Sequence, residues 1–115
     1  MTVKETTELQ NICHIIGNTV TADQIYLFGS HAYGTPNADS DFDLCVVIPD
    51  SLVRPVDVAI KLRQALASAQ LRPLDIVVRH SSQFQKRCQG PTLERKIARE
   101  GVLLHDGKFM GQGMA

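Results

Sequence analysis

Two aspartates, Asp41 and Asp43, stand one position apart at the start of an apolar run that ends at Ile48. Side chains at i and i+2 of a β-strand point the same way, so these carboxylates would lie about 6–7 Å apart. At an effective dielectric near 20, two such charges repel by roughly 3 kcal/mol, and a bound cation relieves that repulsion. Carboxylate oxygens favour Mg²⁺ or Mn²⁺ over zinc. The pair therefore indicates a divalent-cation site, with a solvated surface pair as the alternative.

A glycine-serine pair, Gly29 and Ser30, follows directly after the short apolar run of residues 25–28. Glycine lets a ligand approach the backbone closely, and successive N–H groups with a serine hydroxyl can hold phosphate oxygens. Gly34 completes a GxxxxG spacing, but no Lys-Ser/Thr follows it, so this is not a P-loop. The pair is a candidate phosphate-binding turn, and an ordinary loop is the alternative.

A third carboxylate, Asp75, lies within the apolar segment Leu74–Val78. An acid in a buried strand is costly unless it is paired or bound to a metal. If this strand lies beside the strand of Asp41 and Asp43, three carboxylates converge. Such a cluster can hold two metal ions for in-line attack on phosphorus. The alternative is an ordinary polar residue near the start of a strand.

Hydrophobic periodicity predicts the elements that must position these residues. We expect strands at residues 25–28, 41–48, 74–78 and 102–104. A helix at residues 5–16 should end at Gly17, which would serve as a left-handed cap. Its apolar stripe consists of Leu9, Ile12, Cys13 and Ile16.

Two further helical regions are expected between and after these strands. Residues 53–69 should form one helix, capped by Asp50 or Ser51 and with Pro55 in its first turn. Residues 81–100 should form two helical pieces that are broken near Gly90-Pro91. The buried stripe of the first helix should consist mainly of Val56, Ala59, Ile60, Leu66 and Ala67.

Length and composition limit the possible classes of protein. The chain has 115 residues, 43% apolar and 21% charged, which is enough for one globular domain. No stretch approaches the roughly 18 apolar residues that a membrane span needs, and no signal-peptide pattern opens the chain, so we expect a cytoplasmic protein. Three cysteines without a Cys-x-x-Cys pair exclude a zinc ribbon and favour reduced thiols.

The charges are separated along the chain. Residues 1–50 hold seven acids and one base, a net charge of −6, whereas residues 51–115 hold eleven bases and five acids, a net charge of +6. This asymmetry is compatible with a cation site in the first half and with a polyanion or acidic partner near the second. Ordinary surface charge that mixes once the chain folds is the alternative.

These motifs together resemble a known family. The run Leu27-Phe28-Gly29-Ser30-x-Ala32-x-Gly34, followed by Ser40-Asp41-x-Asp43-Leu44, resembles the core motif of the DNA polymerase β-type nucleotidyltransferases. The similarity is to their minimal members, the MNT proteins, which are often encoded next to a HEPN-domain partner. Leu74–Val78 resembles the third-carboxylate strand of the family, and Ile97–Leu104 resembles its usual end, so the likeness spans about residues 24–105.

The resemblance implies an α+β fold, with a small mixed sheet and helices packed mainly on one face. Residues 1–105 would form a single nucleotidyltransferase domain, and residues 106–115 a flexible tail.

The resemblance also assigns roles to residues. Gly29 and Ser30 would hold the β- and γ-phosphates of a nucleoside triphosphate, and Ser40 belongs to the same nucleotide-binding set. Asp41 and Asp43 would bind the metal ions. Asp75 would complete the metal site or act as the general base. Arg79, just past the strand of Asp75, is the preferred candidate for a cation on the triphosphate.

One departure from the family pattern concerns the turn after Ser30. Many relatives carry Arg or Lys where this chain has Tyr33, so a cation that faces the phosphates would be missing there. Tyr33 could instead donate its hydroxyl or stack on a base, or simply pack on the domain.

The function implied is transfer of a nucleoside monophosphate, AMP from ATP, to a hydroxyl acceptor with two Mg²⁺ ions or with Mn²⁺. The acceptor would lie on a partner such as a HEPN toxin, and the expected protein partner is a HEPN-domain protein or a second copy of this chain. Neither a membrane nor direct nucleic-acid binding is indicated. One alternative is a non-catalytic antitoxin that neutralises a HEPN-type partner by complex formation. Another is a degenerate domain that retains the metal site without transfer.

Overall fold

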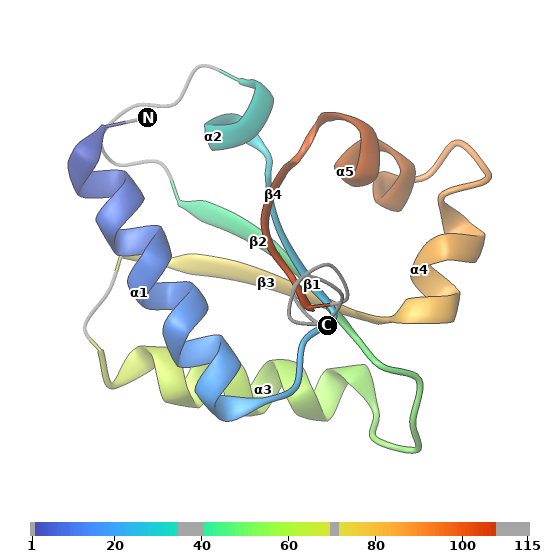
Figure 1. The fold of residues 1–115 in the computed structure, drawn as a ribbon, viewed down its shortest axis with the longest axis horizontal. Coiled ribbons are helices and arrows are strands. Elements are labelled where there is room, and N and C mark those ends of the chain that lie inside the picture. The colour runs from blue at the N-terminus through green and yellow to red at the C-terminus, as the bar shows by residue number, and fades with distance from the viewer. Residues whose placement is uncertain (1, 35–40, 70–71, 108–115) are drawn as a thin grey trace, which may run out of the picture.

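The computed structural model describes residues 2–34, 41–69 and 72–107. The chain folds into a mixed four-stranded sheet with helices on both faces (Figure 1). The α+β class expected from the sequence is confirmed. In chain order the elements are α1 (Val3–Thr19), β1 (Gln24–Phe28), α2 (Ser30–Tyr33), β2 (Phe42–Ile48), α3 (Pro55–Ala67), β3 (Leu74–His80), α4 (Ser81–Arg87), α5 (Leu93–Glu100) and β4 (Val102–Asp106).

The sheet has the strand order β3-β2-β1-β4. β1 pairs antiparallel with both β2 and β4, whereas β2 and β3 are parallel. A parallel pair needs a crossover connection, and α3 provides it. The resulting register sets Asp43 of β2 beside Asp75 of β3 and beside Phe28 at the end of β1.

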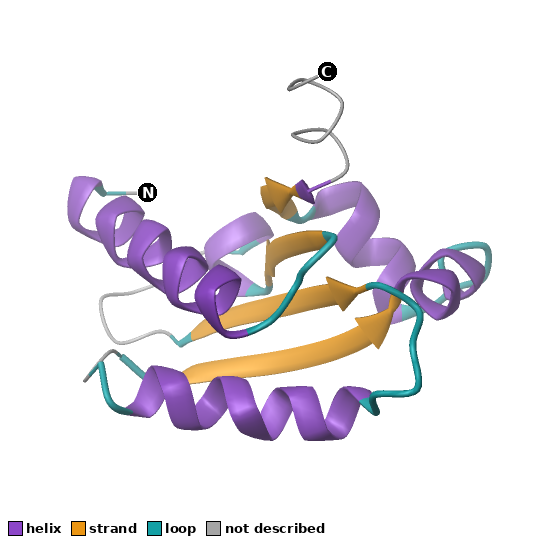
Figure 2. Ribbon diagram, turned by 60° about the horizontal axis from the view of Figure 1, so that its bottom comes forward, coloured by secondary structure: helices purple, strands orange, loops and turns teal. Residues whose placement is uncertain are grey.

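The two faces of the sheet are covered unequally. The larger core lies under α1 and α3, which Figure 1 shows on one side of the sheet, and it includes every second residue of β2 from Phe42 to Ile48. The smaller core lies under α4 and α5 and contains Tyr26, Cys45, Val47, Phe84 and Ile97. Figure 2 shows α1 and α3 in front of the strands. Each face therefore carries two of the longer helices, α1 and α3 on one and α4 and α5 on the other, rather than one face carrying most of them as expected.

Helix α1 continues past the residue expected to end it. Gly17 lies inside the helix, and Val20 in an extended conformation is the C-cap. Ile16 is buried and Val20, just past the helix, packs against the larger core, which outweighs the cost of about 1 kcal/mol for a helical glycine. At the other end, Glu5 N–H donates to Thr2 Oγ1 at 3.1 Å, and Thr2 N–H donates to Glu5 Oε1 at 2.9 Å. This capping box explains why α1 begins at Val3.

Helix α3 buries a face that only partly matches the prediction, since Ala59 and Leu66 are buried as expected but the rest of the stripe is not. Arg54 is its N-cap and makes no side-chain capping bond, so the expected caps, Asp50 and Ser51, were wrong. Val56 and Ile60 are 55% and 48% exposed, and Ala67 is also exposed. Apolar residues occur around most of this helix, and its combined contact with α1 and β3 selects the buried face. The buried residues are Val58, Ala59, Leu62 and Leu66.

The helices expected after β3 are confirmed, but the expected tail begins too early, since Asp106 belongs to β4, and residues 108–115 lie outside the described residues. The segment after β3 forms two helices, α4 and α5, and Thr92 caps the second of them. All three cysteines are free, and burial raises the pKa of the Cys45 thiol to about 12, so it stays a protonated core residue. Within the described ranges, no helix is both long and apolar enough to cross a membrane.

The corrected face of α3 leads to a stability prediction. Leu62→Ala should lower the free energy of unfolding by about 2–5 kcal/mol, because Leu62 is fully buried. Ile60→Ala, two positions away and half exposed, should change it by less than about 1 kcal/mol. Urea unfolding followed by circular dichroism measures both. Similar losses for the two variants would contradict the described orientation of α3.

Candidate active site

The turn between β1 and α2 is built around Gly29. Its backbone has a φ of 76°, in a region that residues other than glycine rarely adopt. A Cβ atom placed on Gly29 would also collide with the carboxylate of Asp43. The Gly29 carbonyl accepts hydrogen bonds from the N–H groups of Ala32 and Tyr33, at 3.0 and 3.1 Å, which form the single turn of α2. Gly29 therefore lies directly against Asp43, and Ser30 follows it as the first residue of α2.

Asp43 and Asp75 form a pair of adjacent carboxylates. They occupy register-matched positions on the parallel strands β2 and β3. Desolvation raises the pKa of Asp43 above its usual range, and the charge of Asp75 and a side-chain hydrogen bond with it raise it further. The charge of Asp41 acts in the same direction, and only His31 opposes it. The pair thus retains a repulsion that a bound cation would relieve.

Asp41 lies just before β2 and is exposed. Among the side chains that the structure describes, no three His, Cys, Asp or Glu residues are grouped closely enough to hold a metal ion. The expected convergence of all three carboxylates is therefore not seen in the side-chain positions. The pair still fits a hard cation, because Mg²⁺ is usually bound through one or two carboxylates together with substrate phosphates.

Of the expected nucleotide-binding residues, Arg79 lies away from the carboxylate pair. Ser40 lies outside the described residues. Arg79 lies four positions past Asp75, about 13 Å further along β3. Its Nε lies 3.3 Å from Glu94 Oε2, and its Nη1 donates to the carbonyl of Val78 at 2.9 Å. Contact of Arg79 with a triphosphate remains a prediction and would require the guanidinium to leave Glu94.

Ion pairs that local sequence patterns do not reveal surround the start of β2. Arg72 donates two hydrogen bonds to Glu8 at 2.9 Å, and its guanidinium stacks over the Phe42 ring, 4.3 Å from the centroid. The ring of His31 lies 3.3 Å from Glu5 and also packs against Phe42. These contacts join α1 to the residue that precedes Asp43.

A second unpredicted contact lies on the other side of α2. Lys96 of α5 places its Nζ 4.6 Å from the centroid of the Tyr33 ring. The two residues are far apart in the sequence, so neither spacing nor periodicity could have paired them.

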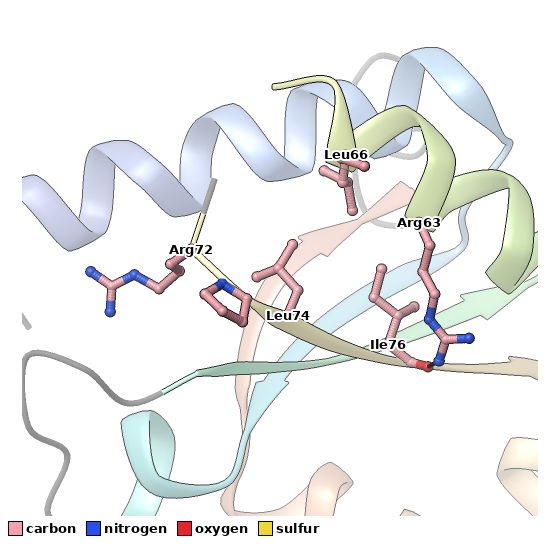
Figure 3. Close-up of a pocket in the computed structure, with 7 residues that line it drawn as sticks. Arg63, Leu66, Arg72, Leu74 and Ile76 are labelled. Carbon is pink, nitrogen blue, oxygen red and sulfur yellow. Dashed lines mark hydrogen bonds between the residues drawn. The ribbon is translucent and has the colours of Figure 1, made fainter. Parts of the chain in front are cut away.

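A pocket of about 230 Å³ between α3 and β3 is distinct from the carboxylate pair (Figure 3). Its wall includes Leu74 and Ile76, which face the larger core, whereas Asp75 between them points to the opposite face of the sheet. Arg63 Nη2 donates to the carbonyl of Ile76 at 3.3 Å and so protects part of the open edge of β3. This pocket therefore does not provide a path to the aspartates.

The Gly29 turn leads to a prediction with an internal control. Gly29→Ala should destabilise the domain by more than about 1 kcal/mol, because φ is positive and the new Cβ meets Asp43. Gly17→Ala has no atom within 4 Å of its new Cβ and lies inside α1, so it should stabilise by about 0.5–1 kcal/mol. Urea unfolding compares the two. A Gly29→Ala protein as stable as wild type would refute the described turn.

The raised pKa of Asp43 predicts how stability depends on pH. Because the folded state binds this proton more tightly than the unfolded state, the stabilisation is present at low pH and is lost as pH rises through the folded pKa. In EDTA at pH 7, Asp43→Asn should therefore melt a few degrees above wild type, and the difference should disappear near pH 3. Melting curves from pH 3 to 7 test this.

The control for this measurement is Asp57→Asn. Asp57 is exposed and pairs with Arg54 in the first turn of α3, so its loss should slightly lower the melting temperature. An Asp43→Asn variant that melts below wild type at pH 7 without divalent cations would show that the repulsion is absent.

Comparison with known proteins agrees with this geometry. A protein from Sulfolobus solfataricus that is assigned as a nucleotidyltransferase superposes with a TM-score of 0.63 at 16% identity. The superposition covers 89% of this chain and 80% of that one. A toxin–antitoxin structure, MntA-HpeT with two aspartate-to-glutamate changes, superposes with a TM-score of 0.60 at 25% identity, covering 92% and 79%. A toxin–antitoxin structure with AMP-PNP has a TM-score of 0.56 at 24% identity, covering 92% and 79%. No curated protein matches the chain significantly.

The family match extends over the whole site. Residues 13–104 match the family described as "Nucleotidyltransferase domain", and this range includes the Gly29 turn, all three aspartates and α5. Because this match covers most of the chain, the chain belongs to the nucleotidyltransferase domain family.

Proposed function

We propose that this chain transfers AMP from ATP to a hydroxyl group on a partner protein in the cytoplasm. The observation that supports this most directly is the register of Asp43 beside Asp75, with the Gly29 turn closed against Asp43. That arrangement combines a cation-binding carboxylate pair with a backbone turn to which phosphates can come close. Its location in a nucleotidyltransferase domain gives the reaction class.

The aspartates would hold the metal. Asp43 and Asp75 offer oxygen ligands only, and Asp41 would join them as the third carboxylate, with two Mg²⁺ ions or Mn²⁺ as the expected occupants. When bound, the metal supplies positive charge that stabilises the transferring phosphoryl group and the leaving pyrophosphate.

The chain's own residues would orient the reactants. Ser30 and the N–H groups after Gly29 hold the β- and γ-phosphates, and Ser40 belongs to the same proposed set. The acceptor hydroxyl oxygen forms a bond to the α-phosphorus, and the bond from that phosphorus to the bridging oxygen breaks, so pyrophosphate leaves with the electron pair. Asp75 takes the hydroxyl proton. Asp75 is exposed, so an acceptor carried by another protein can reach it.

A HEPN-type toxin is the partner we propose. A structural relative with 25% identity is a toxin–antitoxin complex, MntA-HpeT. The same likeness favours one alternative, a non-catalytic antitoxin that neutralises its partner by binding alone. Self-association is a further proposed contact.

The transfer reaction can be tested with ATP labelled on the α-phosphate, Mg²⁺ and the co-purified partner. Wild type should transfer label to the partner, and Asp43→Asn should reduce the rate at least about 100-fold, because the substitution removes a metal ligand. Asp57→Asn, a distant exposed aspartate, should retain full activity. Equal labelling by wild type and Asp43→Asn would refute the mechanism.

Rescue of cells that express the toxin separates the two functions. Protein carrying Asp41→Asn and Asp43→Asn should fail to protect if transfer is the neutralising step. Undiminished protection by the double variant, together with a stable complex, would favour the binding function.

A further inference from the structure

Helix α5 lies over the sheet face onto which Asp43 projects. Cys45 and Val47 follow Asp43 at alternate positions of β2, so all three side chains point to the same face. Cys45 and Val47 belong to the same buried cluster as Ile97 of α5. A cation presented by α5 therefore lies on the side of the sheet where an anion would meet the carboxylate pair.

The rotation of α5 about its own axis is fixed by buried contacts. The Glu94 side chain is 3% exposed and accepts hydrogen bonds from Arg87 at 2.6 Å and Arg79 at 3.3 Å. Ile97, three residues later, is fully buried on the same helix face. With this face held against the sheet, the direction in which Lys96 leaves the helix is determined.

Lys96 is directed to the ring of Tyr33. Its Nζ lies 4.6 Å from the ring centroid, and Figure 1 shows α2 and α5 next to each other. Tyr33 ends the helical turn that Ser30 begins, a rise of about 5 Å. In the described part of the chain, Lys96 has no carboxylate partner. The ring orders the ammonium but leaves its charge uncompensated.

Three other candidate cations, His31, Arg72 and Arg79, already have carboxylate partners. His31 lies 3.3 Å from Glu5, Arg72 lies 2.9 Å from Glu8, and Arg79 shares Glu94 with Arg87. Each therefore has a carboxylate that an incoming phosphate would need to displace. Lys96 needs only to exchange a cation–π contact for a phosphate oxygen, and lysine binds phosphate well as a point charge.

We propose that Lys96, positioned by Tyr33, binds the β- or γ-phosphate of the nucleoside triphosphate. This inference rests on the proposed function and adds the residue that makes the site select a triphosphate over a monophosphate. Tyr33 acts as a positioning residue, since it orders the lysine without providing charge. The charge that the turn itself lacks is supplied by α5.

The test is calorimetric binding of ATP and of AMP, each with Mg²⁺, to the full chain. Lys96→Gln should weaken ATP binding at least about tenfold, because it removes a charged partner of phosphate. AMP binding should change less than about twofold, and Lys96→Arg should retain most of the ATP affinity. Arg99→Gln, an exposed cation three residues later in α5, is the matched control and should bind ATP as wild type does.

Raising the salt concentration adds a second readout. The loss of ATP affinity with salt should be shallower in Lys96→Gln than in wild type, because one fewer charge pair is screened. Tyr33→Phe should keep the wild-type ATP affinity, since it keeps the ring face, whereas Tyr33→Leu should weaken ATP binding. In a double-mutant cycle, Tyr33→Leu should have no further effect once Lys96 is glutamine.

The outcomes separate this inference from the proposed function. If wild type binds ATP and Lys96→Gln binds it equally well, the role of Lys96 is overturned while the proposed function stands. If wild type binds no nucleoside triphosphate, the proposed function fails and this inference fails with it. Equal weakening of ATP and AMP would also overturn the assignment to the phosphate chain.

Discussion

Two carboxylates that repel each other, Asp43 and Asp75, are held side by side by the parallel register of β2 and β3. Most features of the site follow from this constraint. The parallel register needs the α3 crossover, and the room beside Asp43 needs a residue without a side chain at position 29. If stability alone mattered, an apolar residue at position 43 or 75 would remove the repulsion. The pKa of Asp43 is raised first by burial and then by the neighbouring Asp75, and this is the electrostatic cost of holding an acid here.

Long-range contacts support the start of β2, where this cost is concentrated. Arg72 bonds Glu8 of α1 and stacks on Phe42, and His31 pairs with Glu5 and packs on the same ring. These largely buried ion pairs link α1, α2 and the strand at one point. On the opposite face, Glu94 forms ion pairs with Arg79 and Arg87, which fix the orientation of α5. Ion pairs therefore hold the helices in place on both faces of the sheet that carries the carboxylate pair.

The sequence predicted the strands well, because the alternation of side chains along β2 matches a sheet whose two faces are covered by different helices. It also singled out Asp43 and Asp75, which the structure places side by side, because an acid inside an apolar strand is conspicuous. It failed where two local interpretations were equally good. The apolar residues of α3 surround most of the helix, and only contact with α1 and β3 selects Leu62 over Ile60. Gly17 is a plausible helix end whose cost is outweighed by packing that the sequence does not display.

The pairing of distant charges was the other part that local patterns could not supply. Arg79 follows the strand of Asp75 in the chain, but its guanidinium reaches Glu94, fifteen positions later. Lys96 reaches Tyr33 across more than half of the chain. Such pairs depend on how α5 packs on the sheet, which is a tertiary property. The sequence gives the sign of each charged side chain, but it does not show which side chain that charge will contact.

The most direct test of the central claim is a pH titration of the Asp43 carboxyl carbon by nuclear magnetic resonance, with and without Mg²⁺. We expect a pKa above the usual range for aspartate in metal-free buffer, because burial and Asp75 oppose ionisation. Mg²⁺ should lower that pKa, and Asp75→Asn should lower it even without the metal. An ordinary pKa that neither Mg²⁺ nor Asp75→Asn changes would contradict the paired-carboxylate site.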